Sequence, residues 1–259
     1  MNFSLLGILT ILGMLGGTLC MLEIGRRFAA RRLAVDPEGA KAGTGVVEGA
    51  VFGLMGLLVA FTFSGAAARF DARRAMIVEE ANCISTAWLR LDMLPSASQP
   101  SLRAKFRQYL EARLAVFRKI PNMTAMKLEL DRVATLQNEI WTQALSACRE
   151  SAAPTTTMLL VPALNQMFDT ATSRTAGIEM HPPMLIYGTL GLLLLASALL
   201  AGYGLGVGKI RDTFHGLSLV LVMTVTVYVI LDFEFPRVGI IRIDRFEQAL
   251  VELQQSMKP

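Results

Sequence analysis

Charged side chains follow the second long apolar run of the chain, and they are the first candidates for chemistry. Arg69 and Arg73 are four residues apart, so they would share one face of a helix, and Glu80 returns to that face. Such a band at a membrane boundary could form a ring of charge in an oligomer and bias which ions pass. The alternative is an interfacial belt with pairs inside the helix, which is the commoner role of boundary charge.

Three further carboxylates lie near the ends of apolar runs. Glu48 and Glu23 flank the first predicted loop, where they could bind a proton or a cation, or could reach water or pair with an arginine. Asp232 closes the last apolar run at the same predicted membrane face as Arg69, so it could pair with the long helix. The candidate pore or interfacial charges are therefore Arg69, Arg73, Glu80, Glu48 and Asp232.

The remaining reactive side chains do not cluster. The two histidines, His181 and His215, have no ligand partner at a useful spacing, and none of the three cysteines belongs to a Cys-x-x-Cys pair. Cys83 and Cys148 could form a disulfide if the middle of the chain lies outside the cytosol. We expect no metal site.

The run GYGLGVGK at 202–209 resembles a phosphate-binding loop, but Ile210 stands where that motif requires serine or threonine. No Gly-x-Ser-x-Gly elbow or serine–histidine–aspartate arrangement is evident. We therefore expect no catalytic residue and no cofactor, and a protein that is not an enzyme.

The elements that would position these residues are membrane helices. Hydrophobic residues make up 53% of the 259 residues and charged residues only 18%, against about 25% in soluble domains. Apolar runs long enough to span a bilayer are predicted at 3–22, 46–63, 184–207 and 216–231. The positive residues follow the first run, so we expect an uncleaved helix rather than a signal peptide.

The middle of the chain is predicted to be helical and to lie outside the membrane. The second span continues without a helix breaker to Leu94, and proline-bounded helices are predicted at 101–119, 123–149 and 155–179. A short amphipathic helix closes the tail. The fold expected is all-α, with two spans in 1–65, an extramembrane helical domain in 66–183, two spans in 184–231 and a tail in 232–259.

The net charge of +4 does not indicate a nucleic-acid partner, because basic residues beside apolar runs more often set membrane orientation. Each side of the predicted topology carries seven basic residues. Five of them follow the first span, which usually dominates, so we expect both termini and the middle domain outside and the two short loops in the cytosol. Lys209 and Arg211 are counted on the side of the two short loops, and Arg237, Arg242 and Arg245 on the opposite side.

Glycine pairs four residues apart occur in several spans. This spacing lets helices approach closely in lipid, and it suits packing within one subunit and association of subunits equally well. The pairs are Gly13/Gly17, Gly45/Gly49, Gly49/Gly53, Gly202/Gly206 and Gly204/Gly208.

Two segments are similar to one family. The Glu-Ala-Asn-x-Ile-x-Thr-Ala-x-x-Arg core at 80–90 and the Asp-x-x-x-Pro-Arg-x-Gly close at 232–239 resemble the bestrophin-like bacterial membrane proteins, and the likeness covers nearly the whole chain. The resemblance implies a four-span protein of the bacterial plasma membrane. Bestrophins are pentameric anion channels, but they hold their extramembrane domain in the cytosol, and no bestrophin pore residue carries over to this chain by position.

These observations predict an oligomeric membrane protein that could conduct ions, with a path along the second span and the Arg69/Arg73 band. The alternative is a non-conducting scaffold or envelope sensor that binds a partner through the helical middle domain. The expected surroundings are a lipid bilayer, further copies of the chain and ions.

Overall fold

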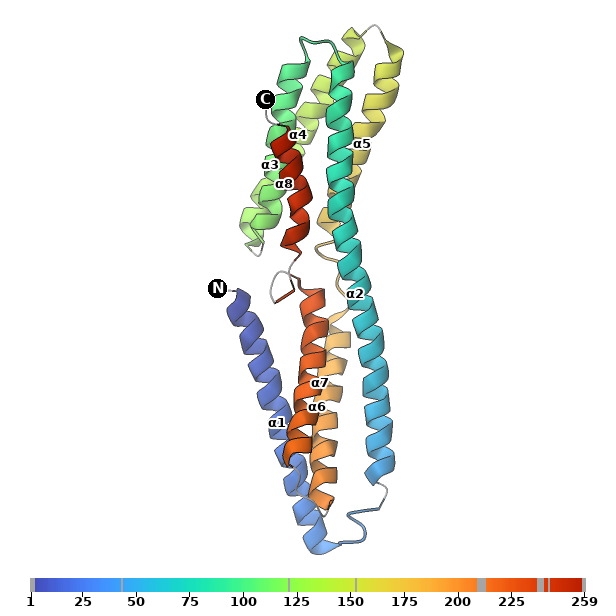
Figure 1. Ribbon diagram of the computed structural model, residues 1–259, viewed down its shortest axis with the longest axis vertical. Coiled ribbons are helices and arrows are strands. Elements are labelled where there is room, and N and C mark those ends of the chain that lie inside the picture. The colour runs from blue at the N-terminus through green and yellow to red at the C-terminus, as the bar shows by residue number, and fades with distance from the viewer. Residues whose placement is uncertain are drawn as a thin grey trace. The chain divides into compact units, whose positions relative to one another are not determined.

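The computed structural model describes residues 3–42, 44–120, 122–151, 153–208, 213–236, 240–241 and 243–257, and every regular element among them is helical (Figure 1). Of the predicted features, Gly43, Gly239 and the basic residues Lys209, Arg211, Arg237 and Arg242 lie outside the described residues, as does the side chain of Arg245. The helices are α1 (Phe3–Val35), α2 (Thr44–Arg90), α3 (Gln99–Arg118), α4 (Met123–Glu150), α5 (Pro154–Ala176), α6 (Met184–Val207), α7 (Thr213–Glu234) and α8 (Gln248–Ser256), with short 3-10 turns at Leu91–Met93 and Asp244–Glu247.

The predicted all-α class is confirmed, and the bounds of α6 coincide with the predicted third span. The second span does continue as one long helix, because no proline or glycine interrupts it after Gly65. The first helix runs thirteen residues beyond the predicted span, to Val35, since its basic segment contains no helix breaker before Pro37. Pro162 lies inside α5, which begins at Pro154.

Two compact units divide the chain. Unit 1 comprises Met1–Asp71 and His181–Arg242, and unit 2 comprises Ala72–Met180 and Ile243–Pro259, so helix α2 contributes to both. Among the described residues, four helices are long and apolar enough to cross a membrane: Gly7–Val35 and Thr44–Met93 at the start of the chain, and Met184–Val207 and Phe214–Glu234 later. The protein is therefore a multi-pass membrane protein.

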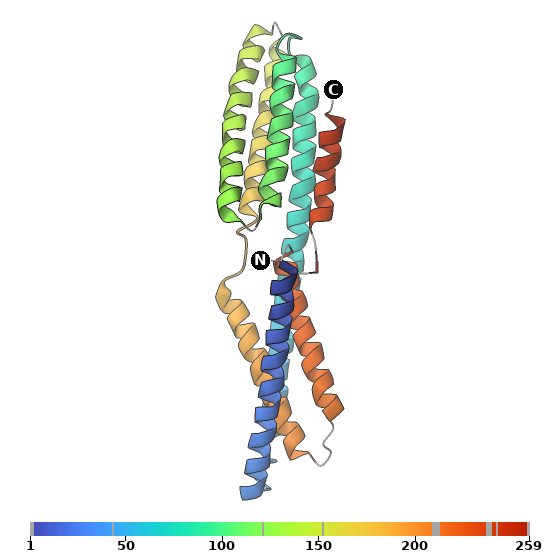
Figure 2. The same ribbon diagram turned by 90° about the vertical axis from the view of Figure 1, so that its left-hand side faces the viewer.

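In unit 1, helices α1 and α6 pack most closely, and α7 lies against both (Figures 1 and 2). Glycines make the α1–α6 approach close. A methyl group on Gly25 would overlap the Leu199 carbonyl oxygen, and one on Gly202 would overlap that of Leu22. Thr18 of α1 also lies 3.3 Å from the hydroxyl oxygen of Thr224 on α7.

Unit 2 is a helical bundle in which α3 packs against α4 (Figure 2) and also contacts α8 (Figure 1). Amphipathic patterning explains the bundle, because each helix turns one apolar face inward. Phe106, Tyr109 and Leu110 of α3 are fully buried, as are Ile140 of α4 and Leu164 of α5.

Candidate functional site

A cluster of charged residues in unit 1 surrounds Glu234, the last residue of α7. Its carboxylate is completely buried and accepts hydrogen bonds from Arg69 Nε and Nη2, the latter at 2.6 Å. The Nδ1 atom of His181 lies 2.9 Å from the other carboxylate oxygen. Arg69, a predicted pore residue, is thus held in an ion pair within its own chain.

Four consecutive residues at the end of α7 each contact a different part of unit 1. The ring of Phe233 packs edge-on against Phe63 and Phe70 of α2, with centroids 5.7 and 5.4 Å away. Phe235 stacks on His181 at 4.7 Å. The Asp-Phe-Glu-Phe sequence at 232–235 therefore fastens the end of α7 to α2 and to the segment before α6.

Asp232 does not meet the long helix. Its carboxylate accepts the backbone N–H groups of Ile240 and Ile241, at distances of 2.8 to 3.1 Å. The expected pairing between the helix end and α2 is instead made by Glu234, which is two residues further along. Asp232 therefore holds the turn that follows α7, in the way that a carboxylate caps free amides.

Arg73 belongs to unit 2 and donates to backbone carbonyls. Its Nη2 lies 2.8 Å from the Met180 oxygen and its Nε lies 3.3 Å from that of Gly177. These carbonyls lie just beyond the end of α5, where a helix leaves oxygens without a helical partner. Arg73 thus closes the end of α5 onto α2.

Glu80 lies in the core of unit 2. It is fully buried and ion-paired with two arginines, Arg113 of α3 and Arg174 of α5, the latter at 2.6 Å. Arg174 also meets Glu247 at 3.1 Å. The four groups balance in charge and connect α2, α3, α5 and the 3-10 turn before α8.

The arginines of this network also pack on an aromatic ring. The guanidinium carbons of Arg174 and Arg113 lie 3.5 and 5.3 Å from the centroid of Phe117. Burial lowers the pKa of Arg174, and the adjacent Glu80 carboxylate opposes that effect. Because arginine stays protonated in proteins, both guanidinium groups of the network remain charged.

Glu48 differs from the other four candidates. Its Oε1 atom is buried and has no hydrogen-bond partner within the described part of the chain. It faces Gly204 of α6, where a methyl group would stand 2.5 Å from Oε1. The structure therefore brings Arg69 together with Glu234, places Arg73 and Glu80 in unit 2, and leaves Glu48 alone at the α2–α6 crossing.

Sequence reasoning missed the partners of these residues. Glu234, Arg113, Arg174 and Glu247 were not singled out as partners. No short-range motif links them, because the contacts join residues 33 to 165 positions apart. A buried carboxylate within an amphipathic helix is the one local signal, since such a group needs a cationic partner.

Neither cysteines nor histidines form a site in the described residues. Cys83 and Cys148 are both buried free thiols, so the disulfide that the sequence allowed is not formed. No group of three potential metal ligands occurs among the described residues.

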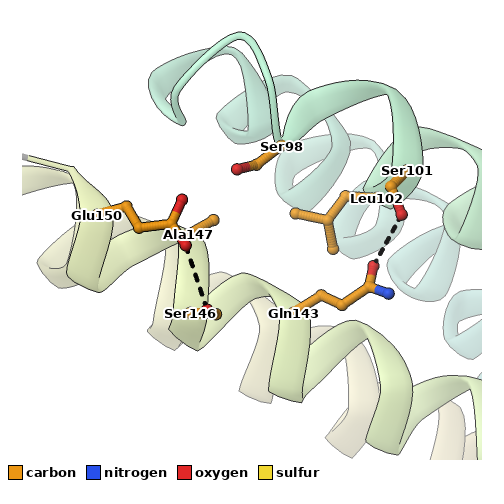
Figure 3. A pocket seen from close by; sticks show the side chains of 7 residues that line it. All are labelled: Ser98, Ser101, Leu102, Gln143, Ser146, Ala147 and Glu150. Atoms are coloured by element: carbon orange, nitrogen blue, oxygen red, sulfur yellow. Dashed lines mark hydrogen bonds between the residues drawn. The ribbon is translucent and has the colours of Figure 1, made fainter.

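One open hollow lies between the start of α3 and the end of α4, with a volume of about 210 Å³ (Figure 3). Ser101 Oγ lies 3.2 Å from Gln143 Oε1, and Ser146 Oγ lies 3.4 Å from Glu150 Oε1. The hollow is smaller than the roughly 300 Å³ at which ligand pockets begin, and four of its polar side chains are already bonded in two pairs. We assign it no ligand.

The comparisons with known proteins agree with the membrane architecture. The family described as the bestrophin-like domain matches residues 13–246, which include all four candidate spans except the first residues of α1. No curated protein and no solved structure matches the chain.

Proposed function

Since the chain belongs to the bestrophin-like domain family, we propose that it assembles with further copies of itself into an ion channel of the bacterial plasma membrane. In this proposal the membrane half of α2 borders the conduction path. Both termini and unit 2 lie outside, and the two short loops lie in the cytosol. The protein has no catalytic role.

One observation carries the proposal: α2 is the least covered of the four spans. In the most apolar 18-residue stretch of each helix, the buried share is only 6% for α2, compared with 17% for α1, 28% for α6 and 33% for α7. A span left open in this way faces either lipid or another subunit. A helix that borders a conduction path between several subunits must present such an uncovered face to the neighbouring subunit.

The glycines of α2 favour another subunit over lipid. No described atom lies within 4 Å of a methyl group built on Gly45, Gly49 or Gly53, whereas the space beside Gly25 and Gly202 is filled by a neighbouring helix of the same chain. Between α1 and α6, the space beside the glycines is filled by the neighbouring helix. On α2, no described atom fills the corresponding space, and a helix from another copy would fit there.

The charged residues along the proposed path differ from the Arg69/Arg73 band that the sequence predicted. Arg69 is neutralised by Glu234, so Arg73 and Glu48 remain as candidate determinants of ion preference. Substitution Arg73→Glu tests the first and Glu48→Gln the second. A shift of reversal potential with either variant would support a path along α2.

The first experiment measures ion flux in liposomes that contain the purified full-length protein. A channel predicts flux above that of empty liposomes. The absence of flux for several anions and cations, from protein that retains its helical circular dichroism signal, would argue against conduction.

A second experiment tests assembly through α2. In a protein whose Cys20, Cys83 and Cys148 are replaced by serine, Gly49→Cys should form disulfide-linked dimers under mild oxidation. The matched control is Leu54→Cys, an exposed position about 140° away around the helix. Equal crosslinking at both positions would contradict a specific glycine interface.

A specific surface favours a second function, a scaffold or sensor that binds a partner. Leu89 and Met158 in unit 2 are 63% and 73% exposed, although Arg90 Nη1 bonds the carbonyl oxygen of Leu159 and brings α2 and α5 together there. In this second proposal the two exposed apolar side chains contact the partner. A scaffold predicts no flux and a crosslinked partner that Leu89→Asp abolishes.

A further inference from the structure

Glu48 is the one ionisable side chain in the membrane half of α2, across residues 44–68. It lies in the second turn of the helix, which begins at Thr44. Its Oε1 atom is buried, and no hydrogen bond to any described group compensates for the lost water. A carboxylate is unfavourable in such a position, whereas a neutral carboxylic acid is tolerated.

The helix opposite reinforces this preference. The carboxyl occupies the space above Gly204, in the last turn of α6. Gly204 accepts the N–H of Gly208 at 3.0 Å, and the carbonyls of the final residues of α6 have no partner within the helix. These oxygens form the negative end of the helix dipole, which repels a carboxylate and can accept a hydrogen bond from a protonated one.

No described group forms an ion pair or a hydrogen bond with Glu48. Helix α6 carries no charged residue between Met184 and Val207, and the Tyr203 hydroxyl donates to the Ala40 carbonyl at 3.2 Å. On α1, Arg27 is paired with Glu23 at 2.9 Å. The carbonyl oxygen of Arg26, also on α1, lies beside Gly206.

The charged residues that follow α6 are Lys209, Arg211 and Asp212, and they lie outside the described residues. An ion pair with Lys209 or Arg211 would hold Glu48 in its charged form, so labelling is also measured in Lys209→Gln and in Arg211→Gln.

We propose that Glu48 is a proton-binding site within the membrane. Near neutral pH its carboxyl packs as the neutral acid against Gly204. Loss of the proton turns the charged group away from α6, towards water at the end of α2, and loosens the α2–α6 crossing. This inference holds whether or not the protein conducts ions, so its test and the flux test succeed or fail separately.

The test uses dicyclohexylcarbodiimide, an apolar reagent that modifies protonated carboxyl groups in membranes. The full-length protein in liposomes is treated at several pH values from about 5 to about 9, and the modified residues are identified by mass spectrometry. Glu23 is the matched control, because it lies within α1, is half-exposed and is paired with Arg27. An ordinary glutamate, with a pKa of about 4.3, is protonated in only about one molecule in 500 at pH 7.

We expect Glu48 to be labelled at least about tenfold more than Glu23 at pH 7, since only a retained proton makes it reactive. Labelling should fall as the pH rises, because the acid form is lost. Equal, weak labelling of Glu48 and Glu23 would overturn the proposal. So would labelling that appears only in Lys209→Gln or in Arg211→Gln, because Glu48 would then be a carboxylate held by that basic residue.

A glycine variant tests the geometry. The methyl group of Gly204→Ala would displace the Glu48 carboxyl, so its labelling should fall several-fold. In Gly191→Ala, on the same helix α6, the added methyl group meets no described atom within 4 Å, and labelling of Glu48 should remain at the wild-type level. Unchanged labelling in Gly204→Ala would contradict the packing. If that variant does not fold, the pH profile of Glu48 against Glu23 in the wild type remains decisive.

Discussion

Arg69 and Glu234 are 165 residues apart in the chain, yet Arg69 Nε and Nη2 lie 2.9 and 2.6 Å from the same oxygen of Glu234. The arginine leaves α2 and the glutamate ends α7, so this pair joins the second and fourth spans. Glu234 is fully buried and Arg69 is 31% exposed, which makes the carboxylate the partner that depends on the contact.

Removing the arginine should therefore destabilise the protein more than it changes ion selectivity. We expect Arg69→Met to lower the free energy of unfolding by about 2–3 kcal/mol, below the 3–5 kcal/mol of a fully buried pair because Arg69 reaches solvent. Thermal unfolding in detergent measures the effect. The double variant Arg69→Met with Glu234→Leu should recover part of the loss, and no recovery would show that the pair is not the cause.

Glu80 should be the most sensitive carboxylate of unit 2. Glu80→Ala leaves Arg113 and Arg174, which are 1% and 4% exposed, without their shared partner. We expect a loss of about 3–5 kcal/mol, measured by chemical unfolding of the purified protein. The adjacent Glu79 is exposed, so Glu79→Ala is the control and should stay within about 0.5 kcal/mol of the wild type. Equal effects at the two positions would contradict the network.

Asp232 should control the segment after α7 rather than the long helix. Asp232→Ala removes the acceptor for the N–H groups of Ile240 and Ile241, so we expect faster hydrogen exchange at these two amides. Hydrogen exchange with mass spectrometry follows peptides that cover 236–243. Exchange in α4, which lies in unit 2, serves as the internal reference. A uniform increase across all peptides would indicate general unfolding instead.

The glycines of α1 should differ sharply in tolerance. A methyl group on Gly25 would overlap backbone atoms of α6, which cannot move aside as a side chain can, whereas one on Gly16 meets nothing within 4 Å. Gly25→Ala should lower the apparent Tm by several degrees and Gly16→Ala should not, since overpacking of a tight contact costs about 1–3 kcal/mol. Similar Tm values for the two variants would show that the α1–α6 crossing can open at little cost.

The sequence alone determined the helical class, the four spans and the continuous helix α2. These features depend on local properties: the length of apolar runs, the 3.6-residue period and the positions of proline. The bounds of α6 followed directly, because His181-Pro182-Pro183 precedes it and its apolar run is unbroken. The basic end of α1 was harder to predict, since polar residues inside a helix resemble a loop by hydropathy.

Only the tertiary structure decided which charges are paired. Arg69 shares a helix face with Arg73 by spacing, but Glu234 holds the first and backbone carbonyls of the α5 end hold the second. It also decided which glycine pairs pack within the chain, at Gly202 and Gly206, and which stay open, at Gly45 and Gly49. The reason is physical: a residue's spacing is set by its own helix, whereas its partner is set by how distant helices cross, and no local pattern encodes that crossing.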